Sequence, residues 1–179
     1  MIEVDHPSSS KQKRMIRHVK ISDAEQICTV YNHYVINTVA TFEEEEVTEE
    51  EMRIRIKQLT RRFPWLVYEV ENELKGYAYA TDWKSRTAYR YSAETTVYVK
   101  SDNIGKGIGS ELYQQLIREM KTLSYQTLVG GIALPNNSSI ALHEKLNFKK
   151  VAHFQQIGFK LNQWVDVGYW QLLLEQNFL

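Results

Sequence analysis

Three of the 8 glycines in this 179-residue chain lie at alternate positions of one short segment, KSDNIGKGIGSELYQQLI (residues 100–117). Glycine inside a helix or strand costs roughly 0.5–1 kcal/mol relative to alanine, so such a cluster needs a reason. A strand-like run precedes it, and apolar residues recurring every four positions predict a helix after it: Ile108, Leu112, Leu116 and Met120. The turn is either a tight strand-to-helix connection or a helix N-terminus whose backbone N–H groups bind a phosphate.

The spacing of these glycines excludes two common nucleotide-binding motifs. A P-loop needs a glycine five positions before Gly105 and a Ser or Thr after the lysine, whereas Lys106 is followed by Gly107. The dinucleotide fingerprint has the spacing G-x-G-x-x-G, and no simple strand–helix–strand repeat begins this chain. Any phosphate site here belongs to another class.

The hydrophobic pattern predicts one mixed α/β domain with the order β-αα-βββ-α-β-α-ββ. The predicted strands are residues 15–20, 65–70, 74–83, 88–99 and 126–134, and two more within 150–174 around a turn near Asn162. The predicted helices cover about 22–34, 48–62, 108–120 and 137–146. The expected domain is residues 15–179, preceded by a flexible polar tail, residues 1–14.

Short local signals mark where the helices begin. Two pairs with the spacing of a capping box are Ser22 with Glu25 and Thr48 with Glu51. The last short helix is expected to be capped by Asn137 or Ser138, directly after Pro135 ends a strand. The acidic run at 43–46 is predicted to be a solvated loop.

Composition narrows the partners and the compartment. The 22 basic and 22 acidic residues cancel, which argues against nucleic acid or an anionic membrane as a partner. The single cysteine, Cys28, leaves no internal disulfide and fits a reducing compartment, so a cytoplasmic location is expected. No apolar run approaches the ~18 residues of a membrane span, and the first residues lack the apolar segment of a secretory signal.

Two longer segments resemble the motifs of a known superfamily. VYVKSDNIGKGIG (97–109) resembles the acetyl-CoA motif of the GNAT acetyltransferases, and IALPNNSSIALHEKLNF (132–148) resembles their later motif. Four further segments are similar to the phosphinothricin N-acetyltransferase group of that superfamily, so that the resemblance spans roughly residues 15–174. They are YNHYVINTVATFE (31–43), RFPWLVYEV (62–70), GYAYATDWKSRTAYRYSAETTVYV (76–99) and GFKLNQWVDVGYWQ (158–171).

The resemblance implies a GNAT fold, a homodimer, no metal, and direct transfer of an acetyl group from acetyl-CoA to an amine in a ternary complex. It implies that the backbone of Val97–Val99, including Tyr98, pairs with pantetheine. The other expected acetyl-CoA contacts are Gly105, Lys106, Gly107, Ile108, Gly109 and Ser110 for the pyrophosphate, and Asn136 and Ser139 for the pantetheine. Ile104 stands where the superfamily usually has Gln or Arg, which leaves Lys106 and backbone donors to hold the pyrophosphate. Asn147 replaces the glycine before Phe148, and asparagine also tolerates the left-handed conformation that ends a helix.

Glu94 is the candidate general base. It interrupts an aromatic and β-branched strand with a carboxylate, which is costly unless the position is solvated or functional. An outward-facing carboxylate is the alternative. His143 stands where many members of the superfamily have a tyrosine that protonates the leaving thiolate, but a histidine in a helix–sheet interface fits equally well. Tyr98 is the second candidate acid, with a core tyrosine as its alternative.

The acceptor site is predicted in the loop after Trp83. Lys84, Arg86 and Tyr89 would clamp a carboxylate and a phosphinate or sulfoximine group, although a K-x-R loop is otherwise ordinary solvated surface. Phe42 and Thr96 are weaker pocket candidates on the same resemblance. Together these residues predict acetylation of the α-amino group of phosphinothricin or methionine sulfoximine.

Three alternatives remain open from the sequence. One is a broader amino-acid, amine or peptide N-acetyltransferase. Another is a CoA-binding regulatory module without catalysis, favoured by Ile104, and the third is an α/β protein that binds no nucleotide. The aromatic residues Trp164, Tyr169 and Trp170 fit either a dimer surface or the core.

Overall fold

The computed structural model describes residues 14–174. The predicted tail therefore lies outside the described residues apart from Arg14, as do the last five residues of the predicted domain. The strands are β1 (Arg14–His18), β2 (Trp65–Val70), β3 (Glu73–Asp82), β4 (Ser92–Val99), β5 (Thr127–Leu134), β6 (Lys149–Lys160) and β7 (Gln163–Leu173). The helices are α1 (Ala24–Asn37), α2 (Glu49–Leu59), α3 (Ile108–Thr122) and α4 (Asn137–Lys145), with short 3-10 turns η1 (Ile21–Asp23), η2 (Thr87–Tyr89) and η3 (Ser101–Asn103). This order confirms the predicted mixed α/β fold.

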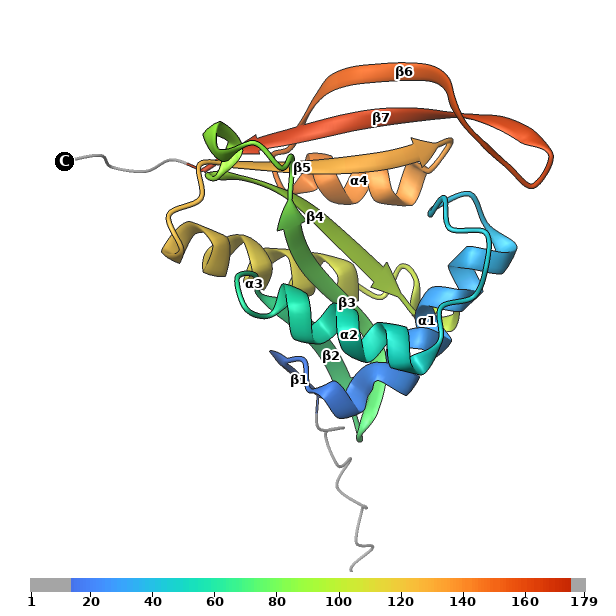
Figure 1. The fold of residues 1–179 in the computed structure, drawn as a ribbon, viewed down its shortest axis with the longest axis vertical. Helices are drawn as coiled ribbons and strands as arrows, with labels where there is room; N and C mark the ends of the chain where they lie inside the picture. Colours follow the sequence, from blue (N-terminus) through green and yellow to red (C-terminus); the bar gives the residue numbers. More distant parts are fainter. Residues whose placement is uncertain (1–13, 175–179) are drawn as a thin grey trace, which may run out of the picture.

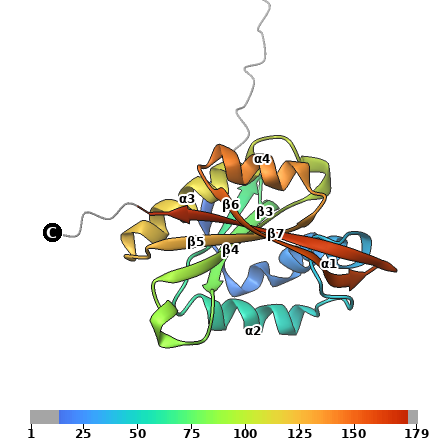
Figure 2. The same ribbon diagram turned by 90° about the horizontal axis from the view of Figure 1, so that it is seen from above.

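The strands form one seven-stranded sheet in the order β1-β2-β3-β4-β5-β7-β6. β4 and β5 run parallel, and every other neighbouring pair is antiparallel. Helices α1 and α2 cover one face of the sheet and α3 and α4 cover the other (Figures 1 and 2). None of the helices in residues 14–174 is long and apolar enough to cross a membrane.

Each face of the sheet has its own hydrophobic core, as the helical spacing of the apolar residues predicts. Under α3 and α4 the buried side chains include Leu112, Leu116, Met120, Leu128, Phe148 and Trp170. Under α1 and α2 they include Ile27, Val30, Tyr31, Met52, Ile56, Trp65, Tyr77 and Cys28, which is a packed residue. A fully buried side chain of this size stabilises the fold by about 1.5–3 kcal/mol.

The parallel pair β4–β5 is short, and this shapes the centre of the sheet. Pairing is confined to three positions, Ser92–Glu94 with Thr127–Val129. Beyond Glu94 the two strands separate, as Figure 1 shows. β4 thereby has one edge that is paired with β3 along its length and another that is free over most of it.

Of the three predicted helix caps, two are wrong and one is confirmed. Thr48 and Glu51 form the expected capping box at α2. At α1 the predicted box of Ser22 with Glu25 is replaced by Asp23, whose carboxylate accepts a hydrogen bond from the Lys20 N–H (2.7 Å) and pairs with Arg17. This half-buried ion pair, absent from local sequence rules, fixes where the chain enters the helix.

At α4 the cap is one residue earlier than predicted. The Asn136 Oδ1 accepts a hydrogen bond from the Ser139 N–H (3.1 Å), so Asn137 is the first helical residue. The strand predicted from residue 88 begins only at Ser92, because Thr87–Tyr89 forms a 3-10 turn before it. Helix α2 ends at Leu59, three residues before the predicted end.

The β6–β7 hairpin forms one edge of the sheet and exposes apolar side chains. Exposed side chains on it include Val151, Phe154, Ile157, Phe159 and Trp164. Of the aromatic residues considered for a dimer surface, Trp164 is 62% exposed, whereas Trp170 is 1% exposed and belongs to the core.

Candidate active site

The free edge of β4 carries unpaired backbone groups. The Lys100 N–H donates to the Lys75 carbonyl oxygen (2.8 Å), so in the antiparallel β3–β4 ladder every second residue from Lys100 turns its polar groups toward β3. Val97 and Val99 therefore turn theirs toward the gap beside β5. The Tyr34 hydroxyl satisfies the Val99 carbonyl. The Val97 N–H and C=O and the Val99 N–H remain available to an extended ligand, the role predicted for them with pantetheine. The Tyr98 backbone, also predicted to pair with pantetheine, turns toward β3 instead.

The glycine turn at the end of this edge has the backbone that the sequence predicts. Gly105 (φ 82°) and Gly107 (φ 85°) are left-handed, and Gly107 is the N-cap residue of α3. A Cβ at either position would meet nothing within 4 Å, so conformation rather than space requires glycine. At Gly109 space matters, because a Cβ there would lie 3.3 Å from Leu142 Cδ2.

Amide groups at this turn are free to bind an anion. The first intrahelical bond of α3 is made by the Glu111 N–H to the Gly107 carbonyl oxygen (3.1 Å), which leaves the N–H groups of 108–110 without helical partners. The Ile104 side chain is exposed on the same turn. The Lys106 ammonium is carried by the same turn and lies 3.4 Å from Asn103 Oδ1. The donor set fits a pyrophosphate.

Glu94 lies where β4 leaves β5, on the face covered by α1 and α2. Because side chains alternate along a strand, Thr96 and Tyr98 share this face. The carboxylate is half-buried, and a Cβ on Gly131 of β5 would lie only 3.3 Å from Glu94 Oε1. Burial raises the pKa of Glu94, while the positive charge of Lys84 acts in the opposite direction. A carboxylate with a raised pKa is a stronger base than an ordinary one.

Tyr98 is surrounded by other tyrosines on the same face. Its ring centroid lies 5.2 Å from that of Tyr31, 5.0 Å from that of Tyr34 and 5.6 Å from that of Tyr77. Burial holds the pKa of Tyr98 well above its ordinary value, while the Thr41 hydroxyl acts in the opposite direction. The phenol therefore keeps its proton at neutral pH and is available as a donor.

His143 lies on the opposite face, inside the interface between α4 and the sheet. It is 2% exposed, with Nδ1 2.8 Å from the Ser139 carbonyl oxygen and Nε2 3.3 Å from the Tyr113 hydroxyl. A Cβ on Gly130 would lie 2.3 Å from Nε2, so this glycine makes room for the ring. Burial lowers the pKa of His143. This environment favours the structural alternative over the catalytic one.

Of the five predicted acceptor residues, Thr96 lies on β4 and the other four lie on two loops. Lys84, Arg86 and Tyr89 are exposed between β3 and β4, and Lys84 lies close enough to Glu94 to lower its pKa. The Lys84 ammonium also lies 4.7 Å from the centroid of the Trp83 ring. Phe42 is in the loop between α1 and α2, residues 38–48, which is called the acceptor loop below.

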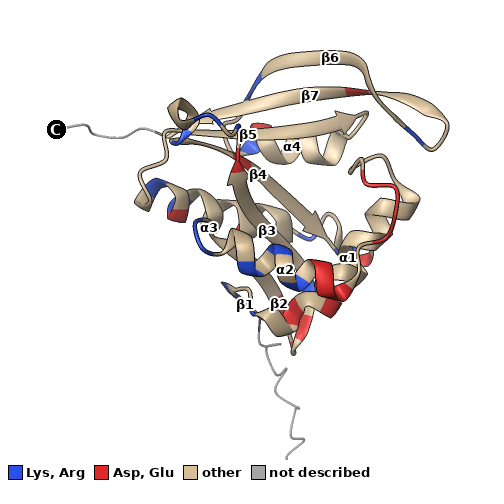
Figure 3. Ribbon diagram, in the orientation of Figure 1, with Lys and Arg blue, Asp and Glu red and all other residues tan. Residues whose placement is uncertain are grey.

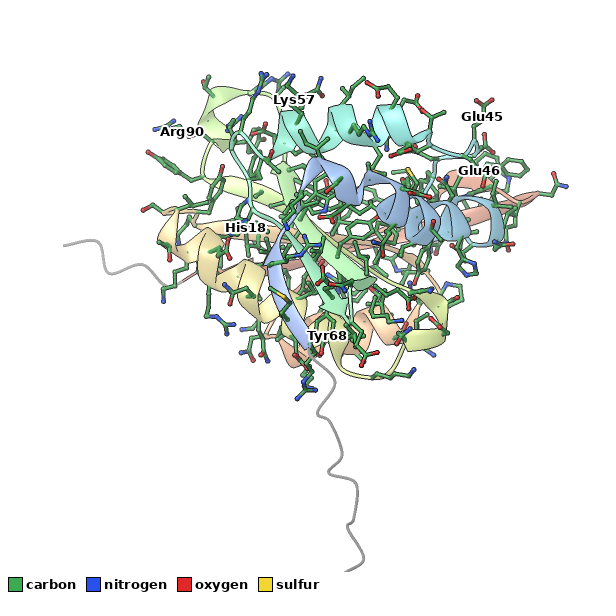
Figure 4. All side chains as sticks on the ribbon, turned by 90° about the horizontal axis from the view of Figure 1, so that it is seen from below. His18, Glu45, Glu46, Lys57, Tyr68 and Arg90 are labelled. Carbon is green, nitrogen blue, oxygen red and sulfur yellow. The ribbon has the colours of Figure 1, made fainter. Side chains whose placement is uncertain are left out.

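A hydrogen-bond network that no sequence pattern predicts holds the acceptor loop in place. The Tyr31 hydroxyl hydrogen-bonds with Thr41 Oγ1 (2.8 Å) and Glu43 Oε1 (2.9 Å). Both oxygens of Glu43 accept from the Arg55 guanidinium (2.7 and 3.0 Å). The prediction of a solvated acidic run is therefore correct for the residues after Glu43, which are exposed, as Figure 4 shows for Glu45 and Glu46.

Comparison with known proteins places the chain in a family. Residues 16–168 match the model described as an acetyltransferase (GNAT) domain. The chain belongs to the GNAT acetyltransferases. This confirms the predicted family, and the free β4 edge, the glycine turn and the strand divergence are features of a GNAT domain in this chain.

Several GNAT relatives are similar along most of their length. A phosphinothricin N-acetyltransferase of Streptomyces viridochromogenes is 38% identical over 156 residues, covering 87% of this chain and 85% of the relative. An L-methionine sulfoximine/L-methionine sulfone acetyltransferase of Salmonella typhimurium is 34% identical over 163 residues, covering 90% and 95%. A solved phosphinothricin acetyltransferase of Sinorhizobium meliloti, in complex with acetyl-CoA, superposes with a TM-score of 0.87 at 34% identity, covering 90% of this chain and 88% of that one.

Proposed function

We propose that this GNAT protein is an acetyl-CoA-dependent N-acetyltransferase that acetylates the α-amino group of a small amino-acid-like substrate such as phosphinothricin or methionine sulfoximine. The observation that carries the proposal is the position of Glu94, a half-buried carboxylate with a raised pKa at the point where β4 leaves β5. The substrates of the similar proteins support the acceptor class.

The residues on the free β4 edge and the glycine turn would hold acetyl-CoA. The backbone of Val97 and Val99 pairs with the pantetheine, and the amides of 105–110 bind the pyrophosphate with Lys106. Asn136 Oδ1 already accepts from the Ser139 N–H and the Ser138 hydroxyl, so the Asn136 side-chain NH₂ is the group that donates to a pantetheine carbonyl. Bound acetyl-CoA supplies the acetyl group as an activated thioester.

Glu94 removes the proton that makes the acceptor amine unreactive. An α-ammonium group must lose a proton before its nitrogen attacks a carbonyl carbon, and the partly buried Glu94 accepts it directly or through water. Lys84 next to this carboxylate, with Arg86 and Tyr89, binds the anionic groups of the acceptor, and Thr96 lines the same face. Phe42 contributes an apolar wall from the acceptor loop.

Tyr98 is the proposed proton donor to the leaving sulfur. It shares a face with Glu94, and its hydroxyl is protonated at neutral pH. His143 is separated from this face by the sheet and keeps both ring nitrogens against protein atoms, so its proposed role is to hold α4 on the sheet. The proposed acid, Tyr98, and the proposed base, Glu94, therefore lie on the same strand, β4.

The protein is proposed to be a cytoplasmic homodimer with one catalytic domain. The exposed apolar side chains of the β6–β7 hairpin support an interface between two copies, with Trp164 at 62% exposure as its most accessible aromatic residue. The lone, buried Cys28 supports a reducing compartment.

Release of free thiol from acetyl-CoA tests the function. Phosphinothricin, methionine sulfoximine and the twenty amino acids are compared as acceptors at equal concentration. Saturable turnover that is highest with a phosphinate or sulfoximine supports the proposed acceptor class. Turnover only with ordinary amines would favour a broader N-acetyltransferase, and binding of acetyl-CoA without thiol release would favour a regulatory module.

A further inference from the structure

A buried lysine at the end of β6 has no role in the chemistry described so far. Lys160 is 2% exposed. The other buried charged side chain in residues 14–174, Asp23, is paired with Arg17. Within this part of the chain no carboxylate forms an ion pair with the Lys160 ammonium. Burial lowers the pKa of Lys160, and the charges of Glu44 and Glu43 offset only part of that effect. An ammonium group is costly to bury without an ionic partner, so its contacts are expected to matter.

The contact that Lys160 makes joins two distant parts of the chain. Its ammonium donates a hydrogen bond to the Thr41 carbonyl oxygen (2.8 Å), across 119 residues of sequence. Figures 1 and 2 show the turn of the β6–β7 hairpin beside the acceptor loop, and in Figure 3 the acidic part of that loop lies close to the hairpin. The hydrogen bond ties the hairpin to the loop.

A second contact between the hairpin and the acceptor loop is made by Gly158 and Phe42. A Cβ placed on Gly158 would lie 2.4 Å from two carbons of the Phe42 ring, so the ring rests directly on the backbone of β6. Phe42 is nevertheless 45% exposed, with its remaining surface free for a ligand. Lys160 and Gly158 therefore hold two consecutive residues of the acceptor loop, Thr41 and Phe42.

Thr41 also links the acceptor loop to the face of the sheet that carries Glu94 and Tyr98, which is called the reactive face below. Thr41 Oγ1 hydrogen-bonds with the Tyr31 hydroxyl (2.8 Å). The rings of Tyr31 and Tyr98 meet edge to face. Thr41 is thus held through its backbone by Lys160 and through its side chain by Tyr31, whose ring packs on Tyr98 of the strand that carries Glu94.

We propose that Lys160 is a positioning residue for acceptor binding: by holding the Thr41 carbonyl it fixes the acceptor loop, and with it Phe42 and the tyrosine pair, against the reactive face. This inference rests on the proposed function, because it assigns Lys160 to the acceptor amine and not to acetyl-CoA. The glycine turn and the free β4 edge make no contact with Lys160, so acetyl-CoA binding is expected to be independent of it.

The test compares K160M, which keeps the length of the side chain without its charge or donors, with K160R, which keeps both. Lys149, an exposed residue at the other end of β6, provides the matched control K149M. A hydrogen bond to a charged group is worth about 1.5–3 kcal/mol, so K160M is expected to lower kcat/KM for the acceptor by about 10-fold or more. Most of the loss is expected in KM. The acetyl-CoA Kd, from calorimetry, is expected to match that of K149M, and K160R is expected to recover most of the activity.

Other outcomes separate this inference from the proposed function. Normal transfer by the unaltered protein together with equal acceptor kinetics in K160M and K149M would overturn the positioning role alone. An equal loss of acetyl-CoA affinity, or no recovery in K160R, would also overturn it. Absence of transfer by the unaltered protein with every amine would overturn the proposed function and the acceptor role with it. If K160M does not fold, K160Q, whose side chain is uncharged and one bond shorter, replaces it with the same expectation for KM.

Discussion

The two faces of the sheet are built in different ways. On the face under α3 and α4, and at the glycine turn that starts α3, the parts come from short motifs whose residues are close in sequence. On the face under α1 and α2, the parts come from β4, the acceptor loop and the end of β6, which Lys160 and Thr41 join across 119 residues. The site proposed for the coenzyme is therefore formed by residues that are close in sequence and mainly by their backbone groups. The proposed acceptor site depends instead on side-chain contacts between distant segments.

Replacing the proposed base, Glu94, is expected to lower the rate of transfer more than any other substitution considered. Loss of general-base catalysis in E94Q should lower kcat by roughly 10²–10⁴-fold while leaving the acetyl-CoA Kd unchanged. The proposed base must be ionised to accept a proton, so the activity of the unaltered enzyme should rise with pH through the raised pKa of Glu94, and E94Q should lose that rise. A pH profile of kcat/KM measures both.

The stability of E94Q gives a control with a defined sign. A carboxyl whose pKa is raised in the folded state favours folding in its protonated form, so its contribution is lost as pH increases from its unfolded pKa through its folded pKa. E94Q should therefore be at least as stable as the unaltered protein at neutral pH. A large fall in Tm would show that the loss of activity reflects damage to the fold.

Removing the cations of the β3–β4 loop should weaken binding of the acceptor and leave acetyl-CoA binding unchanged. The double variant K84A/R86A is expected to lower kcat/KM for a dianionic acceptor by about 100-fold, since each lost charge-assisted contact is worth about 1.5–3 kcal/mol. Because Lys84 lowers the pKa of Glu94, its loss should also move the activity profile to higher pH. Initial-rate kinetics with phosphinothricin test this, and unchanged kinetics would show that these cations do not bind the acceptor.

A change at the glycine turn should damage only the coenzyme side. Gly107 has φ 85°, and a left-handed conformation costs an ordinary residue about 1–2 kcal/mol. G107A is therefore expected to weaken acetyl-CoA binding by about 10-fold, with the acceptor KM little changed. Calorimetric titration with acetyl-CoA provides the measurement. An equal Kd for G107A would mean that the turn does not contact the coenzyme.

The smallest effect on rate is expected for His143. Replacement by glutamine removes a buried ring and its hydrogen bonds, which should cost about 1–3 kcal/mol of stability. If the role is structural, kcat of the folded variant and its pH profile remain close to those of the unaltered enzyme. A fall of kcat comparable to that of E94Q, at an unchanged Tm, would restore His143 as the acid.

The sequence predicted most of the fold because its signals are local. The helical spacing of Leu112, Leu116 and Met120, the Thr48–Glu51 pair and the glycines at 105 and 107 each act within a few residues, and all have the predicted structure. Motif resemblance added the candidate site residues, and the structure brings Glu94, Thr96 and Tyr98 to one face.

What could not be predicted depends on contacts between distant segments. The start of α1 is set by the ion pair of Asp23 with Arg17, and the loop before α2 by Arg55 and Tyr31 on Glu43. The burial of His143 depends on the room left by Gly130. No pattern near Lys160 in the sequence reveals Thr41 as its partner.

The short pairing of β4 with β5, called the joint here, separates the proposed base from the loops proposed to bind the acceptor. Glu94 is the last residue of that joint and is held by strands on both sides, whereas the residues proposed to recognise the acceptor lie on loops that leave the sheet. We expect substitutions and insertions in those loops to change the preferred acceptor without displacing the Glu94 carboxylate. The joint thus gives the chain a route to new amine substrates on an unchanged catalytic frame, and directed evolution of this enzyme is best confined to residues 38–48 and 83–91.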